Sequence, residues 1–495
     1  MRIRVVSTAS GKHALQVVSK RSGVVKVHKH IGTYGNDSEK AILYQKAQDY
    51  IQKYSGQVSF TDYLTSPSLS DVIITQSRPL FAYELLSRCY DKLGFAQYPD
   101  SLIKDLVISR LYHPASKRGL HEYIYESLGR SYSLRTIYRH VKQSLKNGIK
   151  EAFQEALITF ARQDLGDTLQ LVFYDVTTLY FDSQVKTTLK DFGFSKDHHS
   201  TDTQIVIGLV VNKQGFPLYF DVFSGKTFEG HTLVGVIENI QQLLQSPELI
   251  VVADAAMLSQ DNIDHMMAKK IGFIVGARLA NLPLRFIDQV HTQLNKQDNN
   301  IAIFSYRNQR LICQYSAKRA SKDRSDRIKQ IERAKTVIDH PTGIMGRYRF
   351  VKKAKDLKYL INTKLIDKAE KLEGVKGYIT NTNLETQMVI DRYHDLWHIE
   401  NSFRITKSDL EARPIFHRLD ETIKAHMFMV FAGLAISKYI EQSTGMSIKK
   451  VLQHSSRVLT HTIINTKTGE TIDKETSIDD TYLKQIIELL RTVGH

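Results

Sequence analysis

Two short apolar runs restrict the fold of this chain more than any other feature of its sequence. One comprises residues 171–176 and the other residues 249–254. Strands that are apolar at successive positions are typical of sheets covered on both faces. Each run also contains an acid, Asp175 inside the first and Asp254 at the end of the second. The sequence therefore predicts a covered α/β sheet with carboxylates near strand ends, where sites in open α/β sheets gather.

The elements predicted around these two strands follow a recognisable order. The first strand is followed by two further strands and a helix, and the second by a helix and a strand. These added elements are expected at residues 204–211, 216–223, 232–244, 259–270 and 272–277. Three antiparallel strands, a helix and then β-α-β is the order of a ribonuclease-H-like α/β core.

Residues 393–407 are predicted to form an amphipathic helix with a carboxylate in its apolar stripe. Seven positions fall on one helical face: Tyr393, Leu396, Trp397, Glu400, Phe403, Arg404 and Lys407. Burying the Glu400 carboxylate between Trp397 and Phe403, both assigned to the core, is costly unless it is paired or bound to a metal. Spacing alone leaves two alternatives open, a pair with Arg404 one turn later or a metal site.

The three acids Asp175, Asp254 and Glu400 are expected to converge in this topology. Oxygen ligands without a thiolate favour Mg²⁺ or Mn²⁺ over zinc. Two such ions, roughly 3.5 to 4 Å apart, would activate a nucleophilic oxygen and stabilise the leaving oxygen of a phosphodiester. We therefore interpret the three acids as both catalytic residues and metal ligands.

The charge of the chain indicates a polyanionic partner. There are 68 Lys and Arg against 52 Asp and Glu, a formal charge of +16, and nucleic acid is the leading candidate. The two cysteines argue against a disulfide framework and suit a reducing cytoplasm. The longest apolar stretch, residues 427–436, is about half of a bilayer span, so it predicts a buried helix and no membrane partner.

Residues 79–160 are helical by periodicity, and their last part carries a basic face. A helix around residues 119–128 is followed by Gly129 in a short turn and by Ser133 as a plausible N-cap. The next helix places four cations on one side: Arg135, Arg139, Lys142 and Lys146. This is the outline of a helix-turn-helix DNA-binding motif. A solvated basic face on a structural helix is the alternative.

The remaining regions are less specific. A β-rich start with a helix at 39–54 has no legible function, and residues 61–71 resemble a linker. Residues 318–358 hold fourteen Lys and Arg against five Asp and Glu, partly explained by a solvated helix at 325–338. A last helix at 480–491 is either a dimerisation surface or a docked tail.

Five stretches, taken in order, resemble the DDE transposases of bacterial insertion sequences, in the branch with a Tyr-Arg-Glu-Lys signature around the third acid. They are residues 174–181 (YDVTTLYF), 204–233, 251–263 (VVADAAMLSQDNI), 272–279 and 393–417. The resemblance implies that Asp175, Asp254 and Glu400 are the three acids of these enzymes. Tyr393 and Lys407 match the signature, whereas Leu396 stands where its Arg is expected, so Arg404 or Arg392 would have to supply that cation.

The resemblance also divides the chain into regions. It implies a β-rich insertion that interrupts the ribonuclease-H-like core, with strands at 301–306, 310–315, 347–351 and 359–363. The expected domains are 1–60 (β-rich unit plus helix), 72–165 (helical DNA-binding domain), 166–282 (first part of the core), 283–380 (β-rich insertion), 381–442 (second part of the core) and 443–495 (C-terminal helical region).

The activity implied is metal-dependent DNA transposition, with cleavage at the terminal inverted repeats of an element and strand transfer to target DNA. Partners would be double-stranded DNA and a second protomer, in the bacterial cytoplasm at the nucleoid. The expected DNA contacts are Tyr393, Arg404, Lys407, Arg135, Arg139, Lys142 and Lys146. Two alternatives stay open: a metal-dependent nuclease without strand transfer, and a DNA-binding protein with structural acids or a decayed site.

Overall fold

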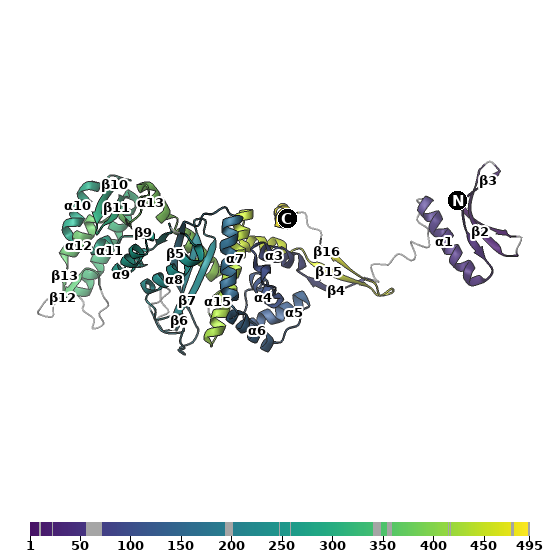
Figure 1. Cartoon of the computed structure of the whole chain (residues 1–495), viewed down its shortest axis with the longest axis horizontal. Helices are drawn as coiled ribbons and strands as arrows, with labels where there is room; N and C mark the ends of the chain where they lie inside the picture. The colour runs from purple at the N-terminus through teal and green to yellow at the C-terminus, as the bar shows by residue number, and fades with distance from the viewer. Residues whose placement is uncertain are drawn as a thin grey trace. The chain divides into compact units, whose positions relative to one another are not determined.

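The computed structural model describes residues 1–495 except 9–10, 22, 56–71, 194–200, 247, 258, 340–347, 354–358, 414, 416, 477–479 and 494–495. The chain divides into two compact units, which are described separately (Figure 1). The first comprises Met1–Gln76 and His461–Lys474, and the second Ser77–Thr460 and Glu475–His495. The linker predicted at 61–71 lies outside the described residues.

The first unit begins with a three-stranded antiparallel sheet covered on one face by a helix. The sheet has the order β1-β2-β3, and the helix predicted for residues 39–54 is α1. The elements are β1 (Arg2–Ser7), β2 (His13–Arg21), β3 (Val24–Tyr34) and α1 (Asp37–Ser55). Leu15, Val17, Tyr34 and Ala47 form a small core between sheet and helix. A second sheet has the order β16-β15-β4, from β4 (Val72–Arg78), β15 (Thr460–Asn465) and β16 (Thr471–Glu475).

The second unit is organised around an eight-stranded mixed sheet of order β10-β11-β14-β9-β8-β5-β6-β7. Its strands are β5 (Leu171–Tyr180), β6 (Gln204–Asn212), β7 (Pro217–Ser224), β8 (Ile250–Ala253), β9 (Gly272–Gly276), β10 (Ile301–Tyr306), β11 (Gln309–Tyr315) and β14 (Val375–Thr380). β5, β8 and β9 pair in parallel, and the other neighbours pair antiparallel. The five strands predicted between residues 171 and 277 are therefore adjacent in one sheet.

The segment 283–380, expected as a β-rich insertion, contributes three strands to the core sheet. Its strands β10, β11 and β14 extend this sheet beyond β9. The rest comprises α10 (Leu284–Leu294), α11 (Ala317–Asp339), α12 (Thr363–Lys371) and a hairpin of β12 (Val351–Lys353) and β13 (Tyr359–Ile361). The sequence could not show this attachment, because an alternating pattern predicts a strand but does not say which sheet the strand joins.

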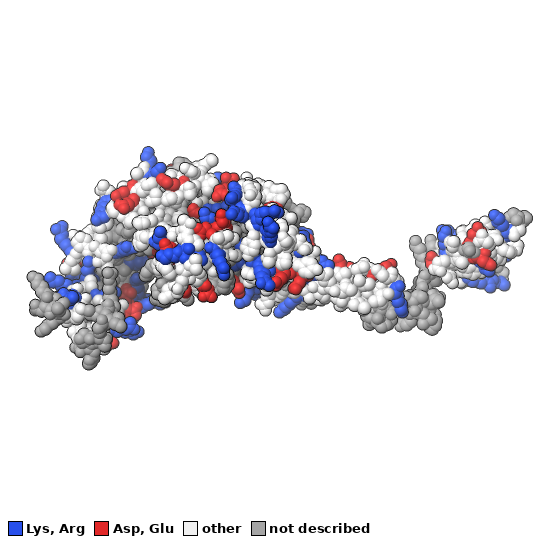
Figure 2. Space-filling model, turned by 90° about the horizontal axis from the view of Figure 1, so that it is seen from below, with Lys and Arg blue, Asp and Glu red and all other residues white. Residues whose placement is uncertain are grey.

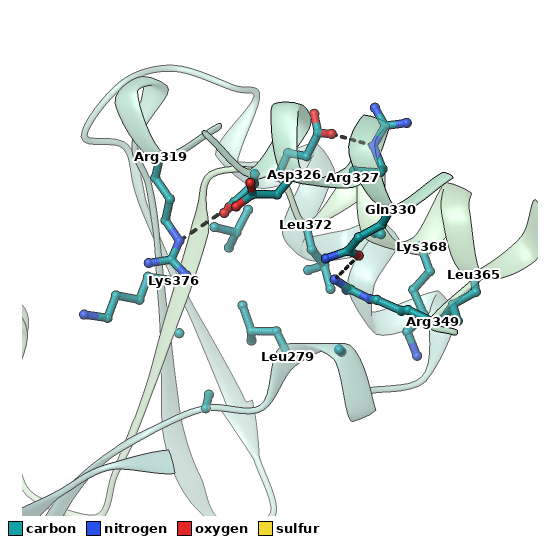
Figure 3. A pocket seen from close by; sticks show the side chains of 17 residues that line it. Leu279, Arg319, Asp326, Arg327, Gln330, Arg349, Leu365, Lys368, Leu372 and Lys376 are labelled. Carbon is teal, nitrogen blue, oxygen red and sulfur yellow. Dashed lines mark hydrogen bonds and ion pairs between the residues drawn. The ribbon is translucent and has the colours of Figure 1, made fainter. Parts of the chain in front are cut away.

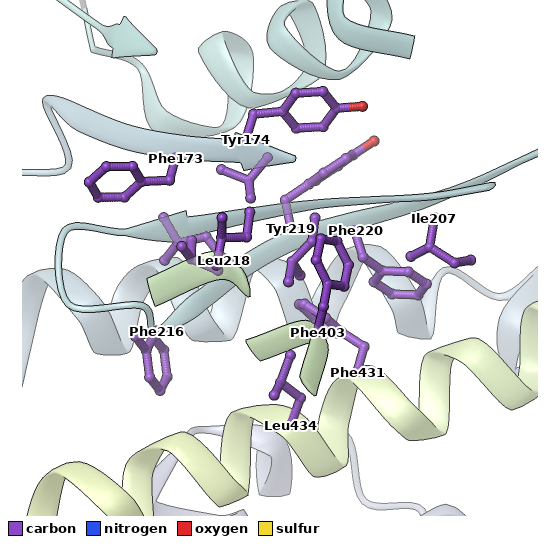
Figure 4. Close-up of a cluster of buried hydrophobic side chains, with 14 of the residues drawn as sticks. Phe173, Tyr174, Ile207, Phe216, Leu218, Tyr219, Phe220, Phe403, Phe431 and Leu434 are labelled. Atoms are coloured by element: carbon purple, nitrogen blue, oxygen red, sulfur yellow. The ribbon is translucent and has the colours of Figure 1, made fainter. Parts of the chain in front are cut away.

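Helices cover both faces of the part of the sheet formed by β5, β6 and β7. On one face lies α8 (Glu229–Leu244), where the Tyr174 hydroxyl donates to Thr232 Oγ1 at 2.6 Å. On the other lie α14 (Trp397–Arg404) and α15 (Asp420–Thr444). The rings of Phe220 on β7 and Phe431 on α15 are 4.5 Å apart there (Figure 4). The continuous apolar runs are thus explained by burial on both sides.

Helix α15 is the packing centre of the second unit. It is the one helix among the described residues that is long and apolar enough to cross a membrane, yet 89% of its apolar window is buried. All residues from 425 to 440 are buried. The helix contacts β7 and the helices α3 (Leu80–Lys92), α4 (Ser101–Tyr112) and α6 (Leu134–Lys146). The prediction of a buried core helix at 427–436 is confirmed.

The predicted pair of helices with a short turn is formed by α5 (Lys117–Leu128) and α6. Gly129 ends α5 with φ of 67°, a left-handed conformation that glycine adopts without strain. Ser133 Oγ accepts the Thr136 N–H at 3.0 Å and so caps α6. The last helices, α16 (Ile448–Ser455) and α17 (Thr481–Val493), contact each other and α3, and α17 buries Leu483 in its own chain.

A buried cluster of basic side chains joins these helices to the segment that follows α14. Arg110 donates to the carbonyl oxygens of Leu410 and Glu411 at 2.9 and 3.1 Å. Lys117 Nζ lies 3.2 Å from His417 Nε2, and His426 stacks edge-on against His417. Burial, and then the charge of Arg110, lowers the pKa of Lys117 to about 7.

Because the pKa of Lys117 is lowered in the folded chain, the free energy of unfolding should increase with pH above neutrality. The folded pKa of Lys117 lies below its ordinary value, so between pH 7 and 8.5 the unfolded chain binds more protons. The gain is at most about 1.4 kcal/mol per pH unit. His417, whose pKa burial lowers to about 3, and His426, whose pKa is also lowered, are neutral in this window.

Thermal melts across this window should show a rising Tm for the natural chain and a flatter profile for Lys117→Met. Lys146→Met, which removes an exposed lysine of α6, is the control and should keep the slope. Equal slopes in all three proteins would contradict the assignment.

Candidate active site

Asp175 and Asp254 occupy neighbouring positions on two parallel strands. Tyr174 of β5 is paired with Ala253 of β8, so the next residue of each strand is an aspartate. Because parallel strands keep side chains in register on one face, both carboxylates lie on the same side of the sheet. Asp175 is half-buried and Asp254 is exposed. β8 ends at Ala253, so Asp254 lies just past its strand, whereas Asp175 lies within β5.

Tyr393 fixes the carboxylate of Asp254. It belongs to α13 (Thr386–His394), and its hydroxyl donates to Asp254 Oδ1 at 3.1 Å. The same oxygen accepts the Ala255 N–H at 2.6 Å. Burial, followed by the charges of Asp254, Tyr378 and Asp175, raises the pKa of the Tyr393 phenol above its ordinary value. The phenol therefore stays protonated as a donor at neutral pH.

Gly276 makes room for this tyrosine. It follows Val275, the partner of Ala253, and therefore lies beside Asp254 on the next strand. A Cβ at Gly276 would stand 2.4 Å from the Tyr393 hydroxyl oxygen and 3.2 Å from Ala255 Cβ. Only a residue without a side chain permits the hydrogen bond between Tyr393 and Asp254.

The helix that carries Glu400 is interrupted, and this corrects the predicted single stripe. α13 ends at His394, α14 begins at Trp397, and a π-helical turn follows at Ile405–Asp409. The buried face is formed by Leu396, Ile399 and Phe403, so only Phe403 of the two predicted core aromatics is buried. Trp397 is 54% exposed, and Glu400 is exposed as well.

The basic residues expected near Glu400 make other contacts in the structure. Arg404 is exposed and donates to Asn401 Oδ1 at 2.7 Å. Leu396, at the position of the signature arginine, is 8% exposed, and a buried guanidinium there would need compensation. Arg392 forms an ion pair with Asp395 at 2.8 Å. Lys407 lies half-buried in the π-helical turn.

Lys376 on β14 is a cation that the sequence analysis missed. Its Nζ lies 4.7 Å from the centre of the Tyr393 ring. Burial and the charge of Arg319 lower the pKa of Lys376, and the carboxylates of Asp254 and Glu400 partly oppose this effect. Lys376 is thus a cation beside the tyrosine that holds Asp254. Its place on a strand of the insertion, far from every motif, left no sequence signal.

Within the described part of the chain, no group of three His, Cys, Asp or Glu side chains is arranged so that it could hold a metal ion. The adjacent strands nevertheless give Asp175 and Asp254 a shared position with oxygen donors only, which suits Mg²⁺ or Mn²⁺. Glu400 comes from a separate helix that contacts β5. The structure thus brings the two aspartates together and leaves Glu400 on the neighbouring element.

The four basic residues predicted on α6 lie outside this acid site. Arg135, Arg139 and Lys146 are exposed, as a DNA-contacting face requires. Lys142 is also exposed but forms an ion pair at 3.0 Å with Glu421 in the first turn of α15. Figure 2 shows one face of the molecule, on which Lys and Arg are distributed with acids between them.

A polar cavity of about 360 Å³ lies beside Lys376, between α11, α12 and β14 (Figure 3). Arg319 pairs with Asp323 at 3.5 Å and Arg327 with Glu373 at 2.6 Å, so these cations are held by acids of the same cavity. Arg349 approaches the cavity from the opposite side and donates to Gln330 at 3.3 Å. The charged stretch predicted at 318–358 therefore contributes side chains to a defined hollow.

These features define a protein with two aspartates side by side on neighbouring parallel strands, next to a helix that carries a glutamate. A family model described as "Transposase DDE domain" matches residues 169–436. The chain therefore belongs to the DDE transposase family. No curated protein matches it. One similar solved structure is a piggyBac transposase synaptic complex with hairpin DNA, with 8% identity, a TM-score of 0.40, and coverage of 77% of this chain and 79% of that chain.

Substituting Gly276 tests the geometry around Asp254. In Gly276→Ala the new methyl group would displace Tyr393, because 2.4 Å is far below van der Waals contact. We expect DNA cleavage to fall at least about tenfold and stability to fall by about 1–3 kcal/mol, as overpacking does. The measurements are cleavage rate and thermal unfolding. Gly235→Ala on α8 meets no atom within 4 Å and is the control. Unchanged cleavage in Gly276→Ala would refute the requirement for close approach.

Proposed function

We propose that the chain is a metal-dependent DNA transposase of an insertion sequence, which cleaves at terminal inverted repeats and transfers the freed strand to target DNA. The observation that carries this proposal is the side-by-side placement of Asp175 and Asp254 below Tyr393. The strand order β7-β6-β5-β8-β9 supports a ribonuclease-H-like core, since β5 is central and is followed in the chain by two antiparallel and then two parallel neighbours.

Asp175, Asp254 and Glu400 are the residues proposed to hold the metal ions. Two ions are proposed, by analogy with other phosphodiester-cleaving sites. Bound Mg²⁺ would supply a polarised phosphate and an activated nucleophilic oxygen. Glu400 is exposed on α14, which contacts β5, so its carboxylate would join the aspartates from the neighbouring helix. Exposure of Asp254 leaves room for a phosphate to enter beside it.

Tyr393 and Lys376 are proposed as positioning groups around these acids. The Tyr393 hydroxyl keeps one oxygen of Asp254 occupied and so directs the other toward the metal. This role fits its burial better than the direct DNA contact implied by the signature. The Lys376 ammonium lies beside the Tyr393 ring and would add positive charge on that side of Asp254, whereas Leu396 is buried and supplies none.

DNA binding is assigned to several surfaces of the second unit. Arg135, Arg139 and Lys146 on α6 would contact phosphates, with Arg404 and Lys407 closer to the acids. The cavity beside Lys376 lies where the insertion would hold a DNA end. The active form is proposed to be a homodimer that pairs two DNA ends and acts in the bacterial cytoplasm.

The direct test is cleavage of a labelled duplex that carries the end of the encoding element, with Mg²⁺. Asp175→Asn, Asp254→Asn and Glu400→Gln should each reduce cleavage at least about 100-fold, since even outer-shell changes cost 10–100-fold. DNA binding should persist in all three. Asp182→Asn is the matched control, because this exposed acid lies roughly 20 Å further along the β5 direction.

The same assay separates the alternatives. Joining of pre-cleaved ends to a target plasmid would distinguish a transposase from a nuclease that only hydrolyses DNA. Binding without cleavage by the natural chain would favour a DNA-binding protein with a decayed site. Cleavage by Glu400→Gln at the natural rate would remove Glu400 from the site.

Tyr393→Phe tests the positioning role separately. Loss of the hydroxyl should raise the Mg²⁺ concentration needed for half-maximal cleavage by about 10–100-fold, while cleavage recovers at high Mg²⁺. Tyr378→Phe is the control, because that ring packs 5.1 Å from Tyr393 but its hydroxyl lies 3.3 Å from His394. An unchanged Mg²⁺ requirement together with weaker DNA binding would instead identify Tyr393 as a DNA contact.

A further inference from the structure

The N-terminal sheet has a charge distribution that the acid site does not explain. Residues 1–36, which include all of β1, β2 and β3, contain seven Lys and Arg, three His and no Asp or Glu. The three acids of the following helix are Asp37, Glu39 and Asp49. Glu39 caps the start of α1 by accepting the Gly35 N–H at 2.9 Å, and Asp49 accepts from Gln45. None of these described acids forms an ion pair with the sheet.

The two faces of the sheet are chemically different. Leu15 and Val17 point toward α1, and Gly32 is so close to this helix that a Cβ there would lie 2.9 Å from Leu43. Side chains alternate along a strand, so the even-numbered positions of β2 point away from α1. The register then places the polar side chains of Arg2, Arg4, Gln16, Lys20 and His30 on the outer face, around the buried Ala14 and Val18 of β2. All of these polar residues are exposed except Gln16, which is half-buried.

We propose that this outer face is a second DNA-binding surface, which contacts duplex DNA through side chains of β1 and β2. Neighbouring strands lie about 5 Å apart, so the backbone of the three-stranded sheet is roughly 10 Å across and matches a major groove about 12 Å wide. Arg2 and Arg4 on one strand and Lys20 on the other then reach phosphates on both sides of the groove. The proposal rests on the proposed function only in taking duplex DNA as the substrate.

Charge complementarity identifies this partner. A surface without any acid attracts a polyanion, and each phosphate contact made by Lys or Arg releases counterions. Lys12 and Lys26 add positive charge to the same small sheet, whereas Lys29 lies on the α1 side, with its Nζ 5.2 Å from the centre of the Tyr50 ring. Figure 2 shows Lys and Arg on the surface of the N-terminal unit, together with acids. In the described part of the chain no ion pair neutralises Arg2, Arg4 or Lys20.

The test compares two variants that lose the same charge from the same unit. Arg4→Gln with Lys20→Gln removes two cations from the outer face. Lys40→Gln with Lys46→Gln removes two exposed cations from α1. The full chain is titrated against a 40-bp DNA duplex in EDTA between 50 and 200 mM NaCl, so that binding is scored without cleavage. The DNA-binding proposal can therefore be supported or overturned even if the chain does not cleave DNA.

The sheet variant should bind at least about tenfold more weakly at 100 mM salt, and the slope of log K against log salt should decrease by about 2, or about 0.9 per phosphate contact. The helix variant should stay within about twofold of the natural chain. Circular dichroism and thermal melting show whether the sheet variant is folded. The variant Arg4→Lys with Lys20→Arg keeps both charges and should bind as the natural chain does. It therefore shows whether substitution at these two positions weakens binding by disturbing the fold.

Equal weakening in the sheet and helix variants would mean that only net charge matters and would overturn the proposal. An unchanged sheet variant would overturn it as well. Heparin and anionic phospholipid vesicles are titrated in parallel. If the sheet variant loses these ligands by the same factor as it loses duplex DNA, the surface is a general polyanion site and the groove-binding assignment fails.

Discussion

Two carboxylates held side by side by parallel strand pairing are the constraint on which the second unit depends. Like charges about 5 Å apart repel by roughly 3 kcal/mol at an effective dielectric constant near 20. The pairing of Tyr174 with Ala253 imposes this proximity on Asp175 and Asp254 regardless of its cost. Two hydrogen bonds relieve this repulsion at the second aspartate, one from the Ala255 amide and one from the Tyr393 hydroxyl. A divalent cation would relieve it further, which is why such an arrangement suits metal-dependent phosphoryl transfer.

The rest of the second unit keeps this arrangement rigid. β5 is paired on both sides, by β6 and β8, and cannot shift register without moving an entire apolar face. The buried helix α15 packs against β7 on one side and against α3 and α4 on the other, so the sheet and the helical region share one core. Arg110 of α4 reaches the carbonyls that end the π-helical turn after α14. The elements around the acid site are therefore tied to the candidate DNA-binding helices.

The sequence predicted this centre well because apolar continuity is a strong signal. The runs that contain Asp175 and Asp254 favoured covered strands, and their order in the chain restricted the sheet topology. The helix of Glu400 was predicted less well. Its heptad-like spacing suggested one stripe, whereas the turn at Asp395 and Leu396 rotates the second segment and exposes both Trp397 and Glu400. Local breaks of this kind depend on tertiary packing, here the packing of Leu396 and Ile399. The spacing of residues in the sequence carries no information about such packing.

Lys376 shows why the insertion could not be understood from its own sequence. Its strand pairs with β9 and β11, so the insertion is built on the core sheet and holds Lys376 at a fixed position beside Tyr393. A lysine on a separate, mobile domain could not serve the acids in this way. Leu396 is buried, so a guanidinium at this position would need compensation, whereas Lys376 lies 4.7 Å from the centre of the Tyr393 ring. The attachment of β14 to the core sheet is what places this ammonium group beside the tyrosine that holds Asp254, and a pattern within one strand does not reveal its neighbours in the sheet.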